Sequence, residues 1–240
     1  MRRFPVLVMA LLSGAVGILH AQTSDWFLSA AFRGSYTTTS KVFYNPESTT
    51  PEIRNEHNIF DNIYGGGVEV RLQNLADNYF VAITVEYLSK LHEQAQLVAL
   101  SNPPRTLPVT DGFHIVPVEL GLNMFIPLGS EKVRLAMGGG LGAYIGDRIF
   151  SVAGVDARQL KRAIGYGIHV ESSFDYRVDS RFSVRGEMRF RDPEILTESR
   201  FDQSTVEYNG TVVAFPRDPF KSRINVNGLT FSLGLVIDIF

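Results

Sequence analysis

The sequence predicts an all-β fold: an eight-stranded antiparallel up-and-down transmembrane β-barrel, with short turns at the periplasmic end and long extracellular loops. Three observations lead to this prediction. The chain opens with an export signal, eight later stretches alternate apolar residues with small or charged ones, and the connectors between these stretches alternate between long and short. A sheet that crosses lipid must close on itself, because the bilayer offers no hydrogen-bond partner to a free edge.

The export signal is expected at residues 1–21. Arg2 and Arg3 form a basic head, an apolar run of 14 residues extends from Val6 to Leu19, and Ala21 precedes the expected cleavage site. A helix that crosses a bilayer needs about 20 apolar residues. The run is therefore too short for a membrane anchor and fits a cleaved signal peptide. Residues 22–240 are then expected to form one barrel domain.

The composition excludes several classes of function. The formal net charge is −2, and it becomes −4 once Arg2 and Arg3 are removed. No basic block remains, so nucleic acid is not expected as a partner. The chain has no cysteine, which excludes disulfides and thiolate metal sites. None of the later segments reaches about 18 unbroken apolar residues, the length that indicates a membrane helix. No cofactor and no metal site are expected.

The first four strands are expected at residues 26–36, 63–73, 79–90 and 113–126. In each of them, except before residue 118 of the fourth, residues of one parity are apolar and residues of the other parity are small or charged. The third strand is an example, since Ile83 and Val85 alternate with Thr84 and Glu86. Side chains alternate across a strand, so each strand has one apolar face and one polar face.

Pro117 lies inside the fourth strand, where it conflicts with a closed barrel. Proline cannot donate to the ladder, and a closed barrel has no free edge to accommodate it. A β-bulge at Val116-Pro117 would remove the conflict. We therefore expect a bulge that places Phe113 and Ile115 on the apolar face and turns His114 inward.

The last four strands are expected at residues 133–145, 163–176, 181–191 and 229–239. The seventh strand has the clearest alternation, with Val184 and Met188 on one face and Arg185, Glu187 and Arg189 on the other. The connectors at the presumed extracellular end are long, and the last of them extends from residue 192 to about residue 223.

The dipeptide Asn209-Gly210 lies between two β-prone runs in this last connector. An Asn-Gly pair in that context indicates a tight hairpin, so we expect a protruding hairpin in the last loop. A ten-stranded barrel is the structural alternative. It is disfavoured because the run after Asn209 is too short to cross lipid before Arg217-Asp218-Pro219.

Aromatic residues at both ends of the apolar face indicate that this face meets lipid. Two aromatic rings about one bilayer apart mark membrane interfaces. A soluble barrel with an apolar interior is the alternative. Glycine crowds the polar face, however, and a narrow lumen is where such small residues are needed. The predicted aromatic girdle consists of Trp26, Tyr36, Tyr64, Tyr79, Tyr87, Tyr166, Tyr176, Phe182 and Phe190.

The polar face is then expected to line the lumen. Buried charges must be paired, because an unpaired one costs several kcal/mol. A structural plug of ion pairs is therefore the leading interpretation, and a narrow gated pore is the alternative. The predicted lumen network consists of Glu69, Arg71, Glu86, Glu119, Arg134, His169, Glu171, Asp175, Arg185, Glu187 and Arg189.

The Gly-rich strands, the run from Asn227 to Leu235 and the terminal Phe240 resemble the small eight-stranded outer-membrane β-barrels of the OmpA/OmpX type. The resemblance covers the whole mature chain. It implies a cell-envelope protein of a Gram-negative outer membrane, in contact with lipid and lipopolysaccharide. It also implies insertion by the barrel-insertion machinery, which recognises a terminal aromatic residue. Phe240 departs from the pattern, because it is out of phase with the apolar stripe that ends at Ile239.

No catalytic site is expected. A hydrolytic site needs a nucleophile within hydrogen-bond reach of a base. Ser172 is the obvious serine on the apolar face of a strand, and no histidine lies near it on that face. The glycine run at residues 138–142 lacks the strand–turn–helix context of a dinucleotide-binding loop.

The expected function is that of a non-enzymatic surface protein whose loops bind an extracellular partner or mediate adhesion. Loops that merely shield the barrel rim are the simpler explanation of the same residues. A narrow porin-like channel or transporter for small or hydrophobic solutes is the alternative function. The candidate binding residues of the loops are Phe43, Tyr44, Tyr208, Val212 and Phe215.

Overall fold

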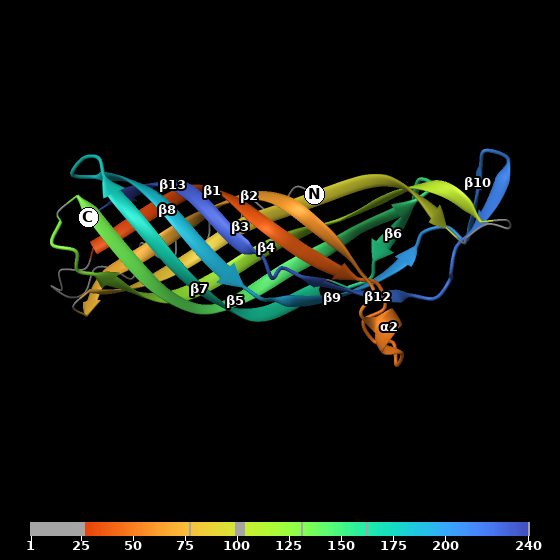
Figure 1. The fold of residues 1–240 in the computed structure, drawn as a ribbon, viewed down its shortest axis with the longest axis horizontal. Coiled ribbons are helices and arrows are strands. Elements are labelled where there is room, and N and C mark those ends of the chain that lie inside the picture. Colours follow the sequence, from red (N-terminus) through yellow and green to blue (C-terminus); the bar gives the residue numbers. More distant parts are fainter. Residues whose placement is uncertain (1–26, 77, 99–103, 131, 162, 240) are drawn as a thin grey trace.

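The structure is a computed structural model, and it describes residues 27–76, 78–98, 104–130, 132–161 and 163–239. The expected signal peptide and Trp26 lie outside these residues. Figure 1 shows one elongated barrel whose strands run obliquely along its long axis. The β10 hairpin lies at one end of the barrel, and the end of β13 lies at the other.

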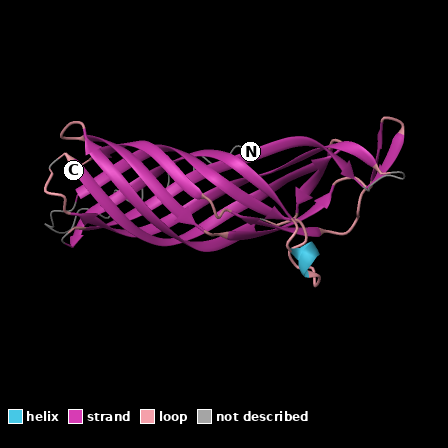
Figure 2. Cartoon of the chain, viewed as in Figure 1, coloured by secondary structure: helices cyan, strands magenta, loops and turns pink. Residues whose placement is uncertain are grey.

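A closed ring of eight antiparallel strands forms the barrel, as predicted. Neighbours in the chain are neighbours in the ring, and the last strand pairs with the first and with the seventh. Figure 2 shows that strands make up nearly all of the described chain. The ring consists of β1 (Phe27–Phe43), β2 (His57–Ala76), β3 (Tyr79–Val98), β4 (Arg105–Ile126), β5 (Val133–Val152), β7 (Ala163–Arg177), β8 (Phe182–Arg191) and β13 (Leu229–Asp238).

The strands are strongly staggered around the ring. Following directly paired residues once around the barrel leads from Phe27 back to Thr37, ten residues further along β1. A closed sheet with this stagger must tilt its strands relative to the barrel axis. As a consequence, residues that are paired in sequence from β1 through β5 lie progressively closer to the extracellular end of the barrel.

Three further strands extend the wall beyond the ring. They are β6 (Val155–Gln159), β9 (Glu194–Phe201) and β12 (Phe220–Asn225), and they pair in the order β5, β6, β9, β12, β1. The sequence predicted loops here, with strands that end near residues 36, 90 and 145. That prediction was wrong because it ended each strand where the regular apolar alternation of a lipid-facing strand ends. Outside the membrane, strands can stay hydrogen-bonded to their neighbours while they carry a mixture of polar and apolar side chains.

The last connector contains the expected hairpin, formed by β10 (Thr205–Tyr208) and β11 (Thr211–Ala214). Asn209 and Gly210 make its turn with φ of 49° and 72°, the left-handed conformation that Asn-Gly pairs adopt readily. The two strands form a separate sheet, so the ten-stranded alternative is excluded.

The described part of the chain contains one short helix, α2 (Pro51–Arg54), which projects from the wall in Figures 1 and 2. No helix among the described residues is long and apolar enough to cross a membrane.

The expected bulge at Val116-Pro117 is absent. The register between β3 and β4 is the same on both sides of Pro117, and Pro117 pairs with Tyr144 on β5. The proline is accommodated by the loss of local pairing to β3 rather than by a shift of register. Phe113 and Ile115 therefore face the lumen and are fully buried, whereas His114 faces outward.

The apolar faces of the ring strands point outward, as predicted. Leu141 is 69 % exposed and Tyr166 is 76 % exposed, values that are incompatible with a soluble barrel whose apolar residues form the core. The described girdle residues all lie on this outer face, and Tyr36 and Tyr64 pack against each other with ring centroids 5.6 Å apart. The outer surface is therefore an apolar belt with aromatic borders, as expected for contact with lipid.

We expect Gly140→Ala to destabilise the barrel, because a Cβ at this position would overlap the backbone carbonyl of Leu120 on β4. The expected cost is about 1–3 kcal/mol, typical of overpacking. The matched control is Gly186→Ala, where an added Cβ meets nothing within 4 Å. The urea midpoint of the refolded barrel is the measurement, and equal midpoints for the two variants would contradict the close packing of β4 on β5.

Candidate functional site

Side chains fill the lumen in alternating apolar and charged layers, and β4 contributes inward side chains to each layer. From its extracellular end, the inward side chains of β4 are first apolar (Leu107, Val109), then acidic (Asp111), then apolar again (Phe113, Ile115), and Glu119 follows after Pro117. The charged layer around Glu119 lies within the membrane-spanning ring. The second apolar layer lies directly above it and contains Ile63, Leu88, Tyr144, Ile195 and Ile224 among others.

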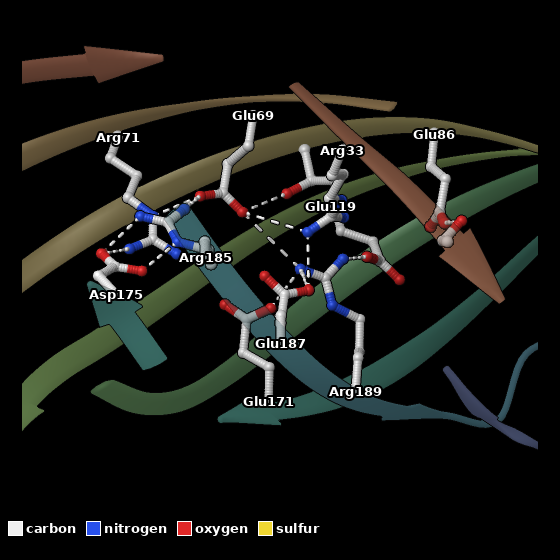
Figure 3. A network of polar contacts seen from close by, with 12 residues as sticks. Arg33, Glu69, Arg71, Glu86, Glu119, Glu171, Asp175, Arg185, Glu187 and Arg189 are labelled. Atoms are coloured by element: carbon white, nitrogen blue, oxygen red, sulfur yellow. Dashed lines mark hydrogen bonds and ion pairs between the residues drawn. The ribbon is translucent and has the colours of Figure 1, made fainter. Parts of the chain in front are cut away.

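Arg189 is the centre of the charged layer (Figure 3). Its guanidinium contacts the carboxylates of Glu119 and Glu171, and its Nη2 lies 2.9 Å from Oε1 of Glu187. These side chains come from β4, β7 and β8, and the closure of the ring brings them together. Its Nη2 also lies 3.9 Å from Glu69 on β2, so one arginine contacts carboxylates from four different strands.

A second group lies nearer the periplasmic end (Figure 3). Arg185 forms a bidentate pair with Asp175, with nitrogen–oxygen distances of 2.5 and 2.8 Å, and its Nη1 donates to Glu69 at 2.7 Å. Arg71 also contacts Glu69. Arg33 links this group to the first, because its Nη1 lies 2.7 Å from Glu187 and 3.4 Å from Glu69.

The upper edge of the charged layer is built around Glu86. Arg191 donates to Glu86 at 2.7 Å, and the Ser35 hydroxyl donates to the other carboxylate oxygen. The Tyr144 hydroxyl donates to Glu119 at 2.7 Å. Tyr144 is also part of the apolar layer, so it joins the two layers.

The charged layer is balanced and closed to water. The layer contains six carboxylates and six arginines. One of these arginines, Arg134, lies 3.8 Å from Asp175 and is partly exposed. The other eleven side chains are only 0–4 % exposed. A water-filled bore through this layer would expose them, so the lumen is plugged here by ion pairs.

The structure brings together the lumen residues selected from the sequence, with one partial exception. His169 lies in the lumen and is buried, but its Nδ1 has no hydrogen-bond partner among the described residues. Sequence reasoning did not select Arg33, Arg191 and Tyr144. Arg191 and Tyr144 have the same parity as the selected residues on β8 and β5, and Arg33 lies on the polar face of the first predicted strand. Membership of the polar face was the signal that could have identified all three.

A second buried ion pair lies above the apolar layer. Arg148 on β5 makes two bonds of 3.2 Å to Asp111 on β4, and its guanidinium lies 4.4 Å from the ring of Phe150. The Tyr44 hydroxyl donates to Asp111 at 3.4 Å. Burial, followed by the Asp111 carboxylate, raises the pKa of the Tyr44 phenol above its usual range. Through the Tyr44–Asp111 hydrogen bond, this ion pair connects the first loop to the wall of the extracellular extension.

Of the five candidate binding residues of the loops, one is strongly exposed. Val212 on β11 is 64 % exposed, whereas Phe215 is buried in the upper apolar cluster beneath the hairpin. Tyr44 points into the extension, and Phe43 is half-buried in the wall under the guanidinium of Arg223. The expectation of exposed loop aromatics was wrong for Phe215 and Tyr44, because the longer wall gives these side chains an interior to fill.

The outer wall holds a polar pair that sequence reasoning missed. Ser89 on β3 is directly paired with His114 on β4, and its Oγ lies 2.8 Å from the ring Nδ1. The Tyr87 hydroxyl lies 2.8 Å from the same nitrogen. The expected bulge at Pro117 placed His114 inside the barrel and concealed this contact. The parity of Ser89 with Tyr87 was the signal that could have identified it.

Comparison with solved structures supports the fold assignment. The crystal structure of the outer membrane protein OprG from Pseudomonas aeruginosa matches with a TM-score of 0.55 and 11 % identity, over 89 % of this chain and 95 % of that chain. The chain has the fold of the small outer-membrane β-barrels. With its apolar outer belt, a barrel of this fold belongs in an outer membrane.

The outer membrane protease OmpT from Escherichia coli also matches, with a TM-score of 0.50 and 8 % identity, over 92 % of this chain and 99 % of that chain. The fold of this outer-membrane barrel is thus compatible with an enzyme. No protein-family model matches the sequence, and no curated protein does.

We expect Arg189→Met to destabilise the barrel strongly, because it leaves the carboxylates of Glu119, Glu171 and Glu187 without their shared cation. Loss of one partner from a buried charge network costs about 3–5 kcal/mol. The matched control is Lys161→Met, which removes a surface ion pair with Glu198 and should leave the unfolding midpoint unchanged. Urea unfolding in lipid vesicles is the measurement, and a midpoint for Arg189→Met equal to that of the control would contradict the network's role.

Proposed function

We propose that this protein is a closed outer-membrane barrel that acts at the cell surface, with its extracellular extension as the binding surface. The observation that carries this proposal is the plugged lumen. A balanced network of buried ion pairs and a continuous apolar layer above it fill the barrel, which supports an anchoring role and disfavours the alternative of a channel or transporter.

The extension is the part of the barrel that offers a surface to a partner. Its wall continues beyond the aromatic girdle and carries the β10–β11 hairpin at the far end (Figure 1). The hairpin is held in place because Val213 and Phe215 are buried against the upper apolar cluster. Among the described residues, its strands pair only with each other, and an outer strand edge can add a strand from a partner.

The surface role requires no catalytic group. It requires a rigid display of the hairpin, and the buried Arg148–Asp111 pair and the upper apolar cluster supply that rigidity. A partner is expected to contact the exposed side of β11 around Val212, together with the free strand edge.

The first test is electrical. We expect the purified, folded chain to give no single-channel current in a planar lipid bilayer, because the charged layer leaves no path for water. Unfolded or aggregated protein is excluded by checking that the unheated sample migrates as a folded band on a gel. Regular, reproducible current steps from the folded wild-type protein would contradict the closed barrel and restore the channel alternative.

The second test concerns the hairpin. We expect Val212→Asp to reduce the adhesion of cells that display the protein to epithelial monolayers and to immobilised matrix protein, since it places a charge on the exposed face of β11. Val178→Asp is the matched control, because Val178 is equally exposed at 64 % but lies in the turn between β7 and β8 at the opposite end of the barrel. Equal adhesion of cells displaying the two variants and the wild type would remove the hairpin from the proposal.

A further inference from the structure

The outer wall carries a serine and a histidine in hydrogen-bond contact. Ser89 and His114 are directly opposite each other on β3 and β4, and both face outward. The distance from Ser89 Oγ to His114 Nδ1 is 2.8 Å, which is the geometry of a nucleophile next to its base. The Tyr87 ring stacks on the His114 ring, with centroids 5.7 Å apart and an interplanar angle of 24°, and limits the orientations of the imidazole.

The pair lies at the level where the polar parts of lipids begin. Tyr87 belongs to the upper aromatic girdle, and Ser89 is the next outward residue on β3 toward the extracellular end. Tyr64, another girdle residue, is directly paired with Ser89 on β2. Aromatic belts mark the headgroup level of a membrane, and the ester bonds of lipids lie at the boundary between headgroups and acyl chains.

An apolar path descends from the pair into the membrane. On β4, the outward residues that follow His114 toward the periplasm are Val116, Val118 and Leu120, and the last two are 37 % and 54 % exposed. A lipid whose ester group lies at Ser89 would therefore extend its acyl chain along an apolar surface. This arrangement selects a substrate with a polar head and a long apolar tail.

We propose that Ser89 and His114 form a hydrolytic site on the outer wall of the barrel, which acts on acyl esters of outer-leaflet lipids. The site goes beyond the surface-binding function and is independent of it. The expectation of no catalytic site considered Ser172 as the outward serine, whereas Ser89 is a second outward serine with a histidine beside it.

The reaction follows from the geometry. His114 Nδ1 takes the proton of the Ser89 hydroxyl while Oγ attacks the ester carbonyl carbon. Collapse of the tetrahedral intermediate breaks the bond to the alcohol oxygen, which receives the proton from His114. Water from the interface then attacks the acyl-serine while His114 takes its proton. The acyl–Oγ bond breaks, Ser89 Oγ regains the proton from His114, and the fatty acid is released. The net reaction is one ester and one water giving one acid and one alcohol.

Two neighbours support the pair. The Tyr87 hydroxyl lies 2.8 Å from the same ring nitrogen as Ser89. This nitrogen accepts one hydrogen bond at a time, so the Tyr87 hydroxyl is free to donate to a substrate oxygen when Ser89 donates to His114. Asp147 on β5 is directly paired with His114 and is exposed on the same outer face. Directly opposed side chains on neighbouring strands lie within interaction distance of each other, so the proposed site includes Asp147 as a positioning residue for the imidazole.

The test uses the full folded chain in mixed micelles, with two substrates in separate arms: diacyl phosphatidylethanolamine and purified lipopolysaccharide. Mass spectrometry measures the released fatty acid and the shortened lipid. We expect release in one arm, which identifies the lipid class, and a loss of about 100-fold or more in Ser89→Ala and in His114→Ala, as is typical for removal of a nucleophile or its base. Ser172→Ala, at an outward serine on β7, is the control and should retain full activity.

A second readout does not depend on the choice of lipid. A long-chain alkyl fluorophosphonate should label the wild-type protein and Ser172→Ala at one serine, and peptide mapping should locate the label at Ser89. Asp147→Asn should lower kcat with little change in KM, and Asp147→Glu should restore part of the activity, which a purely structural role would not produce.

Two results would overturn the proposal. One is the absence of fatty acid release in both arms together with the absence of labelling of folded wild-type protein. The other is release that persists unchanged in Ser89→Ala. Neither result bears on the surface-binding function, which the adhesion of Val212→Asp cells tests separately.

Discussion

The closed hydrogen-bond ladder of the eight ring strands is the constraint on which the rest of the structure depends. Lipid offers no partner to backbone amides and carbonyls, so the sheet must close. Closure with eight strands leaves a narrow lumen, and the inward charges of the central layer are then buried against their neighbours. The arginines and carboxylates of the central layer are paired for this reason, and Arg189 by itself contacts carboxylates from four strands.

The same closure separates the molecule into regions with different tasks. The ring meets lipid on its outer side and is filled by ion pairs on its inner side, so it serves as an anchor. Above it, β6, β9 and β12 continue the wall into water and carry the hairpin. The buried Arg148–Asp111 pair holds this extension together. The outer wall at the membrane interface is a third region, where Ser89 and His114 lie beside the tyrosine girdle.

The resemblance to OprG and to the protease OmpT is one of fold, at 11 % and 8 % identity. A shared fold does not assign a role to this chain, since function depends on groups added to a scaffold. In this chain, a binding surface at the tip and a hydrolytic pair on the wall could coexist. They lie at different heights of the barrel and share no residue.

The alternation of residue types by itself determined the fold class, the number of ring strands, the lipid-facing side and the inward position of the lumen charges, because a strand places side chains on its two faces strictly in turn. Only the tertiary structure decided the partners of those charges, the length of the wall beyond the membrane, and the register at Pro117. These depend on neighbouring strands that are distant in the chain. Pro117 is an example. The proline lacks a backbone N–H donor, and the sheet accommodates it without a bulge. As a result, Phe113 faces the lumen, and His114 contacts Ser89 on the outer wall.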